Sequence, residues 1–157
     1  MTDPIDFRNE FYSKTLRRLI VISHLTKKKK FSQGVPKRIA IMADFLVCNA
    51  LILQNFLASF GKPQQSLRIN DILYNDNLSN GAIDNFEDFG KTIAFLKNLN
   101  LISLIDLDGE LSVSSSWTSA RTTPLIKEWE YNLDEIAPIL TSRSENVLYQ
   151  KILGAAK

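Results

Sequence analysis

The chain is 157 residues long, about the size of one domain with a hydrophobic core of its own. Hydrophobic residues make up 45% and charged residues 23%, a composition that excludes intrinsic disorder and fibrous repeats. The single cysteine, Cys48, excludes an intramolecular disulfide. Because the first residues also show no secretory signal, we expect a cytoplasmic protein.

The net charge of +2 conceals an uneven distribution along the chain. Residues 1–60 carry ten Lys or Arg and four Asp or Glu, which gives a net charge of +6. Residues 61–157 carry nine Lys or Arg and thirteen Asp or Glu, which gives −4. This asymmetry is informative about interaction surfaces.

Residues 11–25 are expected to form the first helix, because apolar side chains recur there at steps of three and four. Lys14, Arg17 and Arg18 fall off that apolar face and are expected on the surface. His24 lies between apolar neighbours in the same helix. We therefore expect a hydrogen-bonded structural histidine at this position rather than a catalytic one.

A predicted turn with a high positive charge follows the first helix. Gly34 and Pro36 indicate that the chain changes direction here before it enters a second helix. The basic side chains of this region are candidate contacts to DNA phosphates; they are Lys27, Lys28, Lys29, Lys30, Lys37 and Arg38. A solvated loop without a binding role is the alternative. Phe31 is the only aromatic residue among them, so the sequence offers no base-stacking platform.

A second helix is expected from Ile39 to Leu53, where Asp44 and Asn49 are the strongly polar residues. A helix that is apolar on nearly all sides belongs in the centre of a domain. Asp44 is expected either to meet a basic side chain or to offer a polar contact to a partner, with Asn49 in the same network. The apolar stretch that continues to Phe60 is not expected to cross a membrane, because burying a carboxylate in the bilayer is costly.

The middle of the chain, residues 66–85, is polar and rich in Asn, which predicts a long loop with at most one short helix, at residues 69–74. Asp84 or the residue after it can cap a third helix, whose first turn carries further acids. That helix is expected to end near Asn98.

The remaining elements are a hairpin and two helices. The hairpin is expected to pair residues 101–105 with residues 111–113 across the turn sequence DLDGE. The next helix tolerates Pro124 in its first turn and is expected to end or kink at Pro138. An amphipathic tail at residues 145–153 closes the chain.

The order of these elements predicts a mainly α protein. Three helices followed by a two-stranded wing are typical of a winged helix, here with helical N- and C-terminal extensions. We expect the winged-helix domain to span residues 1–140 and a C-terminal helical tail to span residues 141–157.

A winged helix that reads DNA normally places the helix before its hairpin in the major groove. In this chain, residues 71–110 carry eight acids and two lysines, a net charge of −6. Because cationic contacts to phosphates supply most of the non-specific affinity for DNA, this charge opposes DNA docking and favours a protein partner. The candidate partner-docking residues are Asp44, Asp84, Glu87, Asp88, Asp106, Asp108 and Glu110.

The sequence predicts neither an active site nor a cofactor or metal site. It has one histidine and one cysteine, and its carboxylates show no metal-ligand spacing. The glycine-rich phosphate loops and the nucleophile elbow of hydrolases are also absent. We therefore expect a protein that is not an enzyme.

Four stretches of this sequence, in this order, resemble one known family. They are FYSKTLRRLIVISHL, then KRIAIMADFLVCNALIL, then FEDFGKTIAFLKNLNLISLIDLDGELSVS, and finally SARTTPLIKEWEYNLDEIAPIL. The chain resembles the small middle components of bacterial ABC three-component systems, which include the accessory subunit of Lamassu-type anti-phage defence. The resemblance extends from Phe7 to Leu140.

The resemblance implies a non-catalytic adaptor subunit. Such a subunit joins an SMC- or Rad50-like ATPase to a separate effector, such as a nuclease, in immunity against phages or plasmids. The assembled complex would hold DNA, to which Lys27–Lys30 could add one phosphate-facing edge. Homodimerisation stays open at this point, and a stand-alone winged-helix transcriptional regulator that binds DNA is the alternative function.

Overall fold

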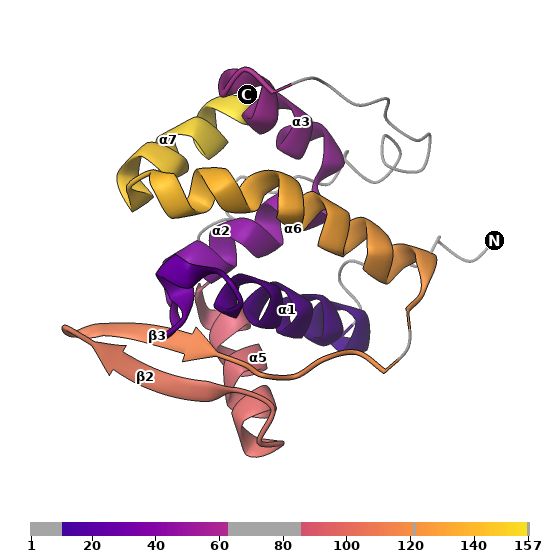
Figure 1. Cartoon of the computed structure of the whole chain (residues 1–157), viewed down its shortest axis with the longest axis vertical. Helices are drawn as coiled ribbons and strands as arrows, with labels where there is room; N and C mark the ends of the chain where they lie inside the picture. Colours follow the sequence, from indigo (N-terminus) through magenta and orange to yellow (C-terminus); the bar gives the residue numbers. More distant parts are fainter. Residues whose placement is uncertain (1–10, 63–85, 121, 157) are drawn as a thin grey trace.

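Helices make up most of the protein, and a small antiparallel sheet lies at one edge of them (Figure 1). The computed structural model describes residues 11–62, 86–120 and 122–156. The elements in chain order are α1 (Phe11–Thr26), the 3-10 helix η1 (Lys29–Phe31), β1 (Val35–Pro36), α2 (Lys37–Cys48), α3 (Ala50–Ser59), α5 (Phe86–Asn98), β2 (Ser103–Leu107), β3 (Glu110–Ser114), α6 (Pro124–Ser142) and α7 (Glu145–Ala155). The predicted helix at residues 69–74 and the predicted cap at Asp84 lie outside the described residues.

The first helix is confirmed, but its polar side chains are not where the sequence predicted them. Arg17 is 3% and Arg18 is 6% exposed, so both lie in the interior rather than on the surface. Their aliphatic stems pack among the buried residues of α1, and their guanidinium groups reach carboxylates on other helices. The predicted surface position of these two arginines is therefore wrong.

The predicted central helix is two helices rather than one. α2 is buried from Ile39 to Val47, as expected, but α3 leaves it at an angle of 113°. The break lies at Asn49, whose backbone is not helical and whose side-chain amide donates a hydrogen bond of 2.7 Å to the carbonyl of Phe45. Asn side chains break helices in this way because they compete with the main chain for its acceptors. Within the described residues no single helix is both long and apolar enough to cross a membrane.

The sheet contains a strand that the sequence analysis missed. β1, in the region predicted as a turn, pairs antiparallel with β3, and the strand order is β1-β3-β2. Pro36 is compatible with this position because β1 is an edge strand, and one side of an edge strand forms no hydrogen bonds with a neighbouring strand. Just before it, Gly34 passes so close to β3 that a Cβ atom would lie 2.9 Å from Cβ of Ser112.

The predicted hairpin is confirmed, but β2 begins and ends two residues later than expected, and β3 is longer than expected. β2 and β3 are joined by Asp108 and Gly109, whose φ angles are 54° and 83°. Positive φ at both central residues is the geometry of a type I′ turn, for which Asp-Gly is a preferred sequence. The hairpin projects from the body of the protein at the left of Figure 1.

The last two helices are longer and more embedded than expected. α6 begins at Pro124, and the hydroxyl of Thr123 caps it by accepting a hydrogen bond of 3.2 Å from the amide of Ile126. Pro138 does not end α6, which continues to Ser142, so the expected boundary at residue 140 falls inside a helix. α7 packs against α3 and contributes buried apolar side chains to the same core (Figure 1).

Candidate functional site

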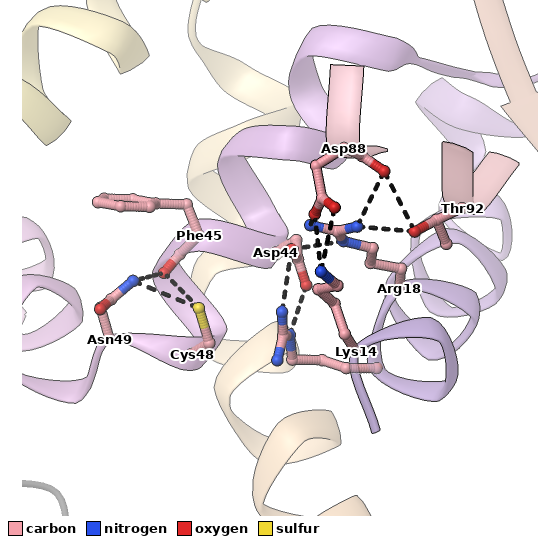
Figure 2. Close-up of polar contacts among 9 residues, drawn as sticks. Lys14, Arg18, Asp44, Phe45, Cys48, Asn49, Asp88 and Thr92 are labelled. Carbon is pink, nitrogen blue, oxygen red and sulfur yellow. Dashed lines mark hydrogen bonds and ion pairs between the residues drawn. The ribbon is translucent and has the colours of Figure 1, made fainter. Parts of the chain in front are cut away.

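A buried ion network holds α1, α2 and α5 together (Figure 2). Asp44 on α2 is 5% exposed and accepts hydrogen bonds from two arginines of α1. Nε of Arg17 lies 2.6 Å from its Oδ1, and Nε of Arg18 lies 3.1 Å from its Oδ2. A carboxylate in an apolar helix is costly unless it is paired in this way. Asp44 is therefore engaged inside the protein and does not reach a partner, and of the two roles expected for it the contact with a basic side chain is the one observed.

The network continues from Arg18 to α5. Nη2 of Arg18 donates to Oδ2 of Asp88 at 2.8 Å, and its Nη1 donates to the hydroxyl of Thr92 at 2.7 Å. Nζ of Lys14 lies 3.1 Å from the same carboxylate of Asp88. The guanidinium of Arg18 also lies 5.0 Å from the centre of the Phe89 ring. The first turns of α5 are thus fixed against α1 by charge as well as by apolar packing.

Asp88 also has a structural role, because its carboxylate pairs with Lys14 and Arg18 of α1. Partial burial raises its pKa, but the hydrogen bonds and charges of Arg18 and Lys14 outweigh that effect and hold the pKa below its usual value of 3.8. The carboxylate is therefore ionised at neutral pH and already has two cationic neighbours. Its side chain is 31% exposed and is already engaged by Lys14 and Arg18.

The exposed negative charge is concentrated on the hairpin. Asp106, Asp108 and Glu110 are all exposed at or beside its turn, where Asp106 also accepts a hydrogen bond of 2.8 Å from the amide of Gly109. On α5, Glu87 is exposed but lies 3.6 Å from Nζ of Lys91. Asp84 lies outside the described residues. The acidic surface predicted for the whole of residues 71–110 is therefore, in the described part, mainly a feature of the hairpin.

The outward face of α5 carries both charged and apolar side chains, because Lys91 and Lys97 are exposed there as well as Phe95. α5 buries Phe89, Thr92, Ile93 and Leu96 against the protein. Phe95 and Leu99, by contrast, are exposed, and they are neighbours on the helix surface because they are four residues apart. Phe95 stacks edge-on against Phe11 with 5.2 Å between ring centres, and Phe11 does the same with Tyr12 at 5.4 Å. We call these four residues, Phe11, Tyr12, Phe95 and Leu99, the apolar patch.

Sequence reasoning missed the apolar patch, although its signal was present. The spacing of Phe95 and Leu99, four residues apart, places both on one side of a helix. Tyr12, next to Phe11, is 73% exposed. Large exposed hydrophobic side chains that touch one another mark interaction surfaces in proteins of ordinary composition.

The six basic side chains do not gather on one face. Lys27, Lys29 and Lys30 are exposed near the end of α1, and Nζ of Lys28 lies 3.7 Å from a carboxylate oxygen of Asp134 on α6. Two other cations point elsewhere. Nζ of Lys37 lies 3.6 Å from the position that a Cβ atom would take at Gly90 on α5, and Nε of Arg38 lies 3.9 Å from a carboxylate oxygen of Glu145 on α7. The structure thus keeps Lys27–Lys30 together and separates Lys37 and Arg38 from them.

His24 has the hydrogen-bonded environment that the sequence predicted. Its Nε2 lies 2.8 Å from Oδ1 of Asp134, and it lines a cavity of about 170 Å³ together with Ser23. The hydroxyl of Ser23 donates its hydrogen bond to the carbonyl of Ile20 at 3.2 Å. A serine nucleophile would instead donate it to the imidazole of the histidine. In the described segments of the chain, His, Cys, Asp and Glu form no group that could hold a metal ion.

No protein-family model, no curated protein and no solved structure matches this chain.

Proposed function

We propose that the fold is a winged helix with a C-terminal helical extension formed by α6 and α7. The order of its elements supports this assignment, because helices α1, α2 and α5 precede the β2-β3 hairpin. The short strand β1, between α1 and α2, adds a third strand to that hairpin. In this assignment α5 occupies the position of the helix that reads DNA in nucleic-acid-binding members of the class.

We propose further that the protein is a non-catalytic adaptor subunit that binds a protein partner through the apolar patch. The apolar patch carries the proposal, because Phe95 near the end of α5 and Leu99 just after it are large exposed apolar side chains, and Phe95 contacts Phe11 of α1. Aromatic side chains are enriched at the centres of protein–protein interfaces, since they bury a large area and lose little conformational entropy. The acidic hairpin supports the same function, because its charge opposes contact with phosphates.

The partner in this proposal is taken from the resemblance to the middle components of ABC three-component systems. The chain would bind an SMC- or Rad50-like ATPase and connect it to an effector, such as a nuclease, in a cytoplasmic complex that defends bacteria against phages or plasmids. DNA would be held by the assembled complex. The chain needs no cofactor of its own for this role.

Co-purification from the native gene cluster tests the proposal. A tagged chain is expected to retain a large ATPase encoded beside it. Leu99→Arg places a charge in the apolar patch and is expected to weaken that retention at least about tenfold, because interface hot spots cost 2 kcal/mol or more. Val147→Arg on α7 is the matched control, since Val147 is 42% exposed and Leu99 is 52% exposed. The control is expected to retain the ATPase.

Two results would contradict the adaptor function. In one, the wild-type chain is recovered from its native gene cluster with no other subunit. In the other, the ATPase is retained equally by the wild type and by both variants, which would exclude the apolar patch as the docking site. Unfolding by urea in each variant confirms that the substitutions leave the fold intact.

The alternative, a stand-alone DNA-binding regulator, is favoured by one observation, the exposed cluster of Lys27–Lys30 in a protein with the element order of a winged helix. It predicts a sequence-selective shift of the chain's own promoter that weakens steeply with salt. Reversing the charges of Lys28, Lys29 and Lys30 should then abolish the shift. DNA binding that survives this reversal would exclude the cluster as the contact.

A further inference from the structure

An open groove of about 710 Å³ lies between the segment that follows α1 and the C-terminal half of α6. The residues that line it are Lys28, Lys29, Lys30, Asp134, Ala137, Pro138 and Thr141. Pro138 has no amide hydrogen, so the carbonyl of Asp134 lacks the donor that an α-helix normally supplies four residues later. We call this feature the lysine groove, because it combines a cationic rim with apolar atoms and a backbone acceptor.

The rim of the lysine groove keeps a positive charge. Within the described residues Lys29 and Lys30 form no ion pair, and both side chains are exposed. The one acid that lines the groove, Asp134, is already engaged, by Nε2 of His24 at 2.8 Å and by Nζ of Lys28 at 3.7 Å. The groove is therefore complementary to a ligand that brings both negative charge and small apolar groups.

The hairpin of the same chain has that chemistry. Asp108 and Glu110 are exposed at its turn, and Leu111 beside them is an exposed apolar side chain. Within the described residues Glu110 forms no ion pair, and Arg38 is directed to Glu145 at 3.9 Å. Burial raises the pKa of Glu145, and a hydrogen bond with Glu110 and the charge of Glu110 raise it further.

We propose that two copies of the chain form a symmetric dimer in which the hairpin turn of each copy enters the lysine groove of the other. The hairpin turn, the C-terminal half of α6 and the connection from α1 to α2 all lie toward the same side of the protein (Figure 1). Two such contacts can therefore form about one twofold axis, and the assembly closes instead of growing into a filament. The proposal does not depend on the adaptor function.

A second copy fits the lysine groove better than DNA does. Lys37 and Arg38 point to other elements and add no positive charge to the groove that a duplex could follow. Phe31, the aromatic residue next to the lysines, is buried and offers no stacking surface for a base. The hairpin turn of a second copy also brings an apolar side chain, Leu111, to place against Ala137 and Pro138.

Sedimentation of the purified full chain over a range of concentrations tests the proposal. The wild type is expected to dimerise at low salt and to dissociate as salt is added, because exposed charge pairs are screened. The groove variant, Lys29→Glu with Lys30→Glu, and the turn variant, Asp108→Asn with Glu110→Lys, are each expected to weaken self-association about tenfold or more. Asn is chosen at position 108 because it tolerates the positive φ angle there.

Mixing the two variants provides the decisive arm. In the mixture, the basic turn of the turn variant meets the acidic groove of the groove variant. The unchanged acidic turn of the groove variant meets the unchanged lysine groove of the turn variant. Dimerisation is expected to return in the mixture although each variant alone is monomeric. The control, Lys91→Glu with Lys97→Glu on α5, changes the charge as much as the groove variant does and is expected to dimerise like the wild type.

Three results would overturn the proposal. The first is a wild type that stays monomeric at every concentration at low salt. The second is a dimer that both variants leave intact, and the third is a mixture of folded variants that stays monomeric. If the groove variant keeps the dimer and instead loses binding to a duplex DNA probe, the groove is a phosphate contact and the proposal is wrong.

Discussion

Asp44 shows how a charged side chain can be a folding requirement. The two arginines that meet it lie 26 and 27 residues earlier in the chain, so the contact forms only when α1 packs on α2. Replacing a buried ion pair by apolar residues is often neutral, whereas removing one partner leaves an uncompensated charge. In this network the loss of Asp44 would leave two buried guanidinium groups without their shared acceptor.

Asp44→Asn is therefore expected to lower the free energy of unfolding by about 3–5 kcal/mol, the usual cost of breaking a buried ion pair. Urea unfolding at neutral pH measures it. Glu87→Gln serves as the control, because Glu87 is exposed and pairs only across one turn of α5; its effect should stay within about 0.5 kcal/mol. Equal stabilities for the two variants would mean that the network contributes no stability.

Asp88 gives the network a dependence on pH. Because its pKa in the folded protein is below the usual 3.8, ionised Asp88 stabilises the fold at pH values above 3.8. That contribution is lost as the pH falls through the lowered pKa. Asp88→Asn is thus expected to be less stable than the wild type at neutral pH, with a difference that shrinks below pH 3.8. A difference that is constant over this range would contradict the assignment.

Single residues also show why part of the site could be predicted from the sequence and part could not. Asp44 in an apolar helix signals that some cation must be buried with it, and the sequence allowed for that contact. Nothing in the local pattern identifies Arg17 and Arg18 as that cation, because an amphipathic helix normally places arginine on its outer face. Their burial depends on a helix elsewhere in the chain.

At the scale of elements, the approach of β1 to β3 depends on Gly34. A Cβ atom at this position would lie 2.9 Å from Cβ of Ser112, closer than side chains tolerate. Gly34→Ala is expected to lower the free energy of unfolding by about 1–3 kcal/mol, since the strands must separate to relieve the overlap. Gly154→Ala on α7 is the control, where a Cβ atom meets nothing within 4 Å.

The control, Gly154→Ala, is expected to change the free energy of unfolding in the opposite direction. Gly154 lies inside a helix, where alanine is favoured over glycine by up to about 1 kcal/mol, so Gly154→Ala is expected to stabilise the protein. Thermal unfolding of both variants measures the two effects side by side. If Gly34→Ala is as stable as the wild type, the close contact between β1 and β3 is not what requires glycine.

The elements that the sequence predicted well are those with strong local signals. α1, the hairpin and the proline-led start of α6 each have a repeating pattern or a specific turn sequence, and all three are confirmed. The break at Asn49 was missed because one polar residue in an apolar run also fits a continuous helix. β1 was missed because two residues carry no periodicity, and their pairing with β3 joins parts of the chain that are far apart in sequence.

At the scale of the whole molecule, the structure separates three surfaces of different chemistry. The hairpin is acidic, the lysine groove is basic, and the apolar patch lies across α1 and α5. The hairpin turn and the N-terminal end of α1 lie on opposite sides of the protein (Figure 1). Contacts at the hairpin turn and at the apolar patch would therefore not exclude one another.

Charge along the chain predicted the acidic hairpin but not the apolar patch. The sequence sum over residues 71–110 counted every acid equally, whereas the fold pairs Asp88 with α1 and brings Lys91 beside Glu87. The apolar patch depends on which face of α5 is covered, and α1 covers one face and leaves Phe95 and Leu99 outside. Exposure of this kind follows from packing and is only partly visible in a sequence.

Photo-crosslinking from the apolar patch tests the central claim, that this face binds a protein, most directly. A photoreactive phenylalanine analogue at position 12 replaces Tyr12, which is 73% exposed, and the same analogue at position 131 replaces Tyr131 on α6, which is 49% exposed. In cells that carry the native gene cluster, position 12 is expected to crosslink to the ATPase subunit and position 131 to give much less of that product. Crosslinks from position 12 to DNA, or equal protein crosslinks from both positions, would contradict the claim.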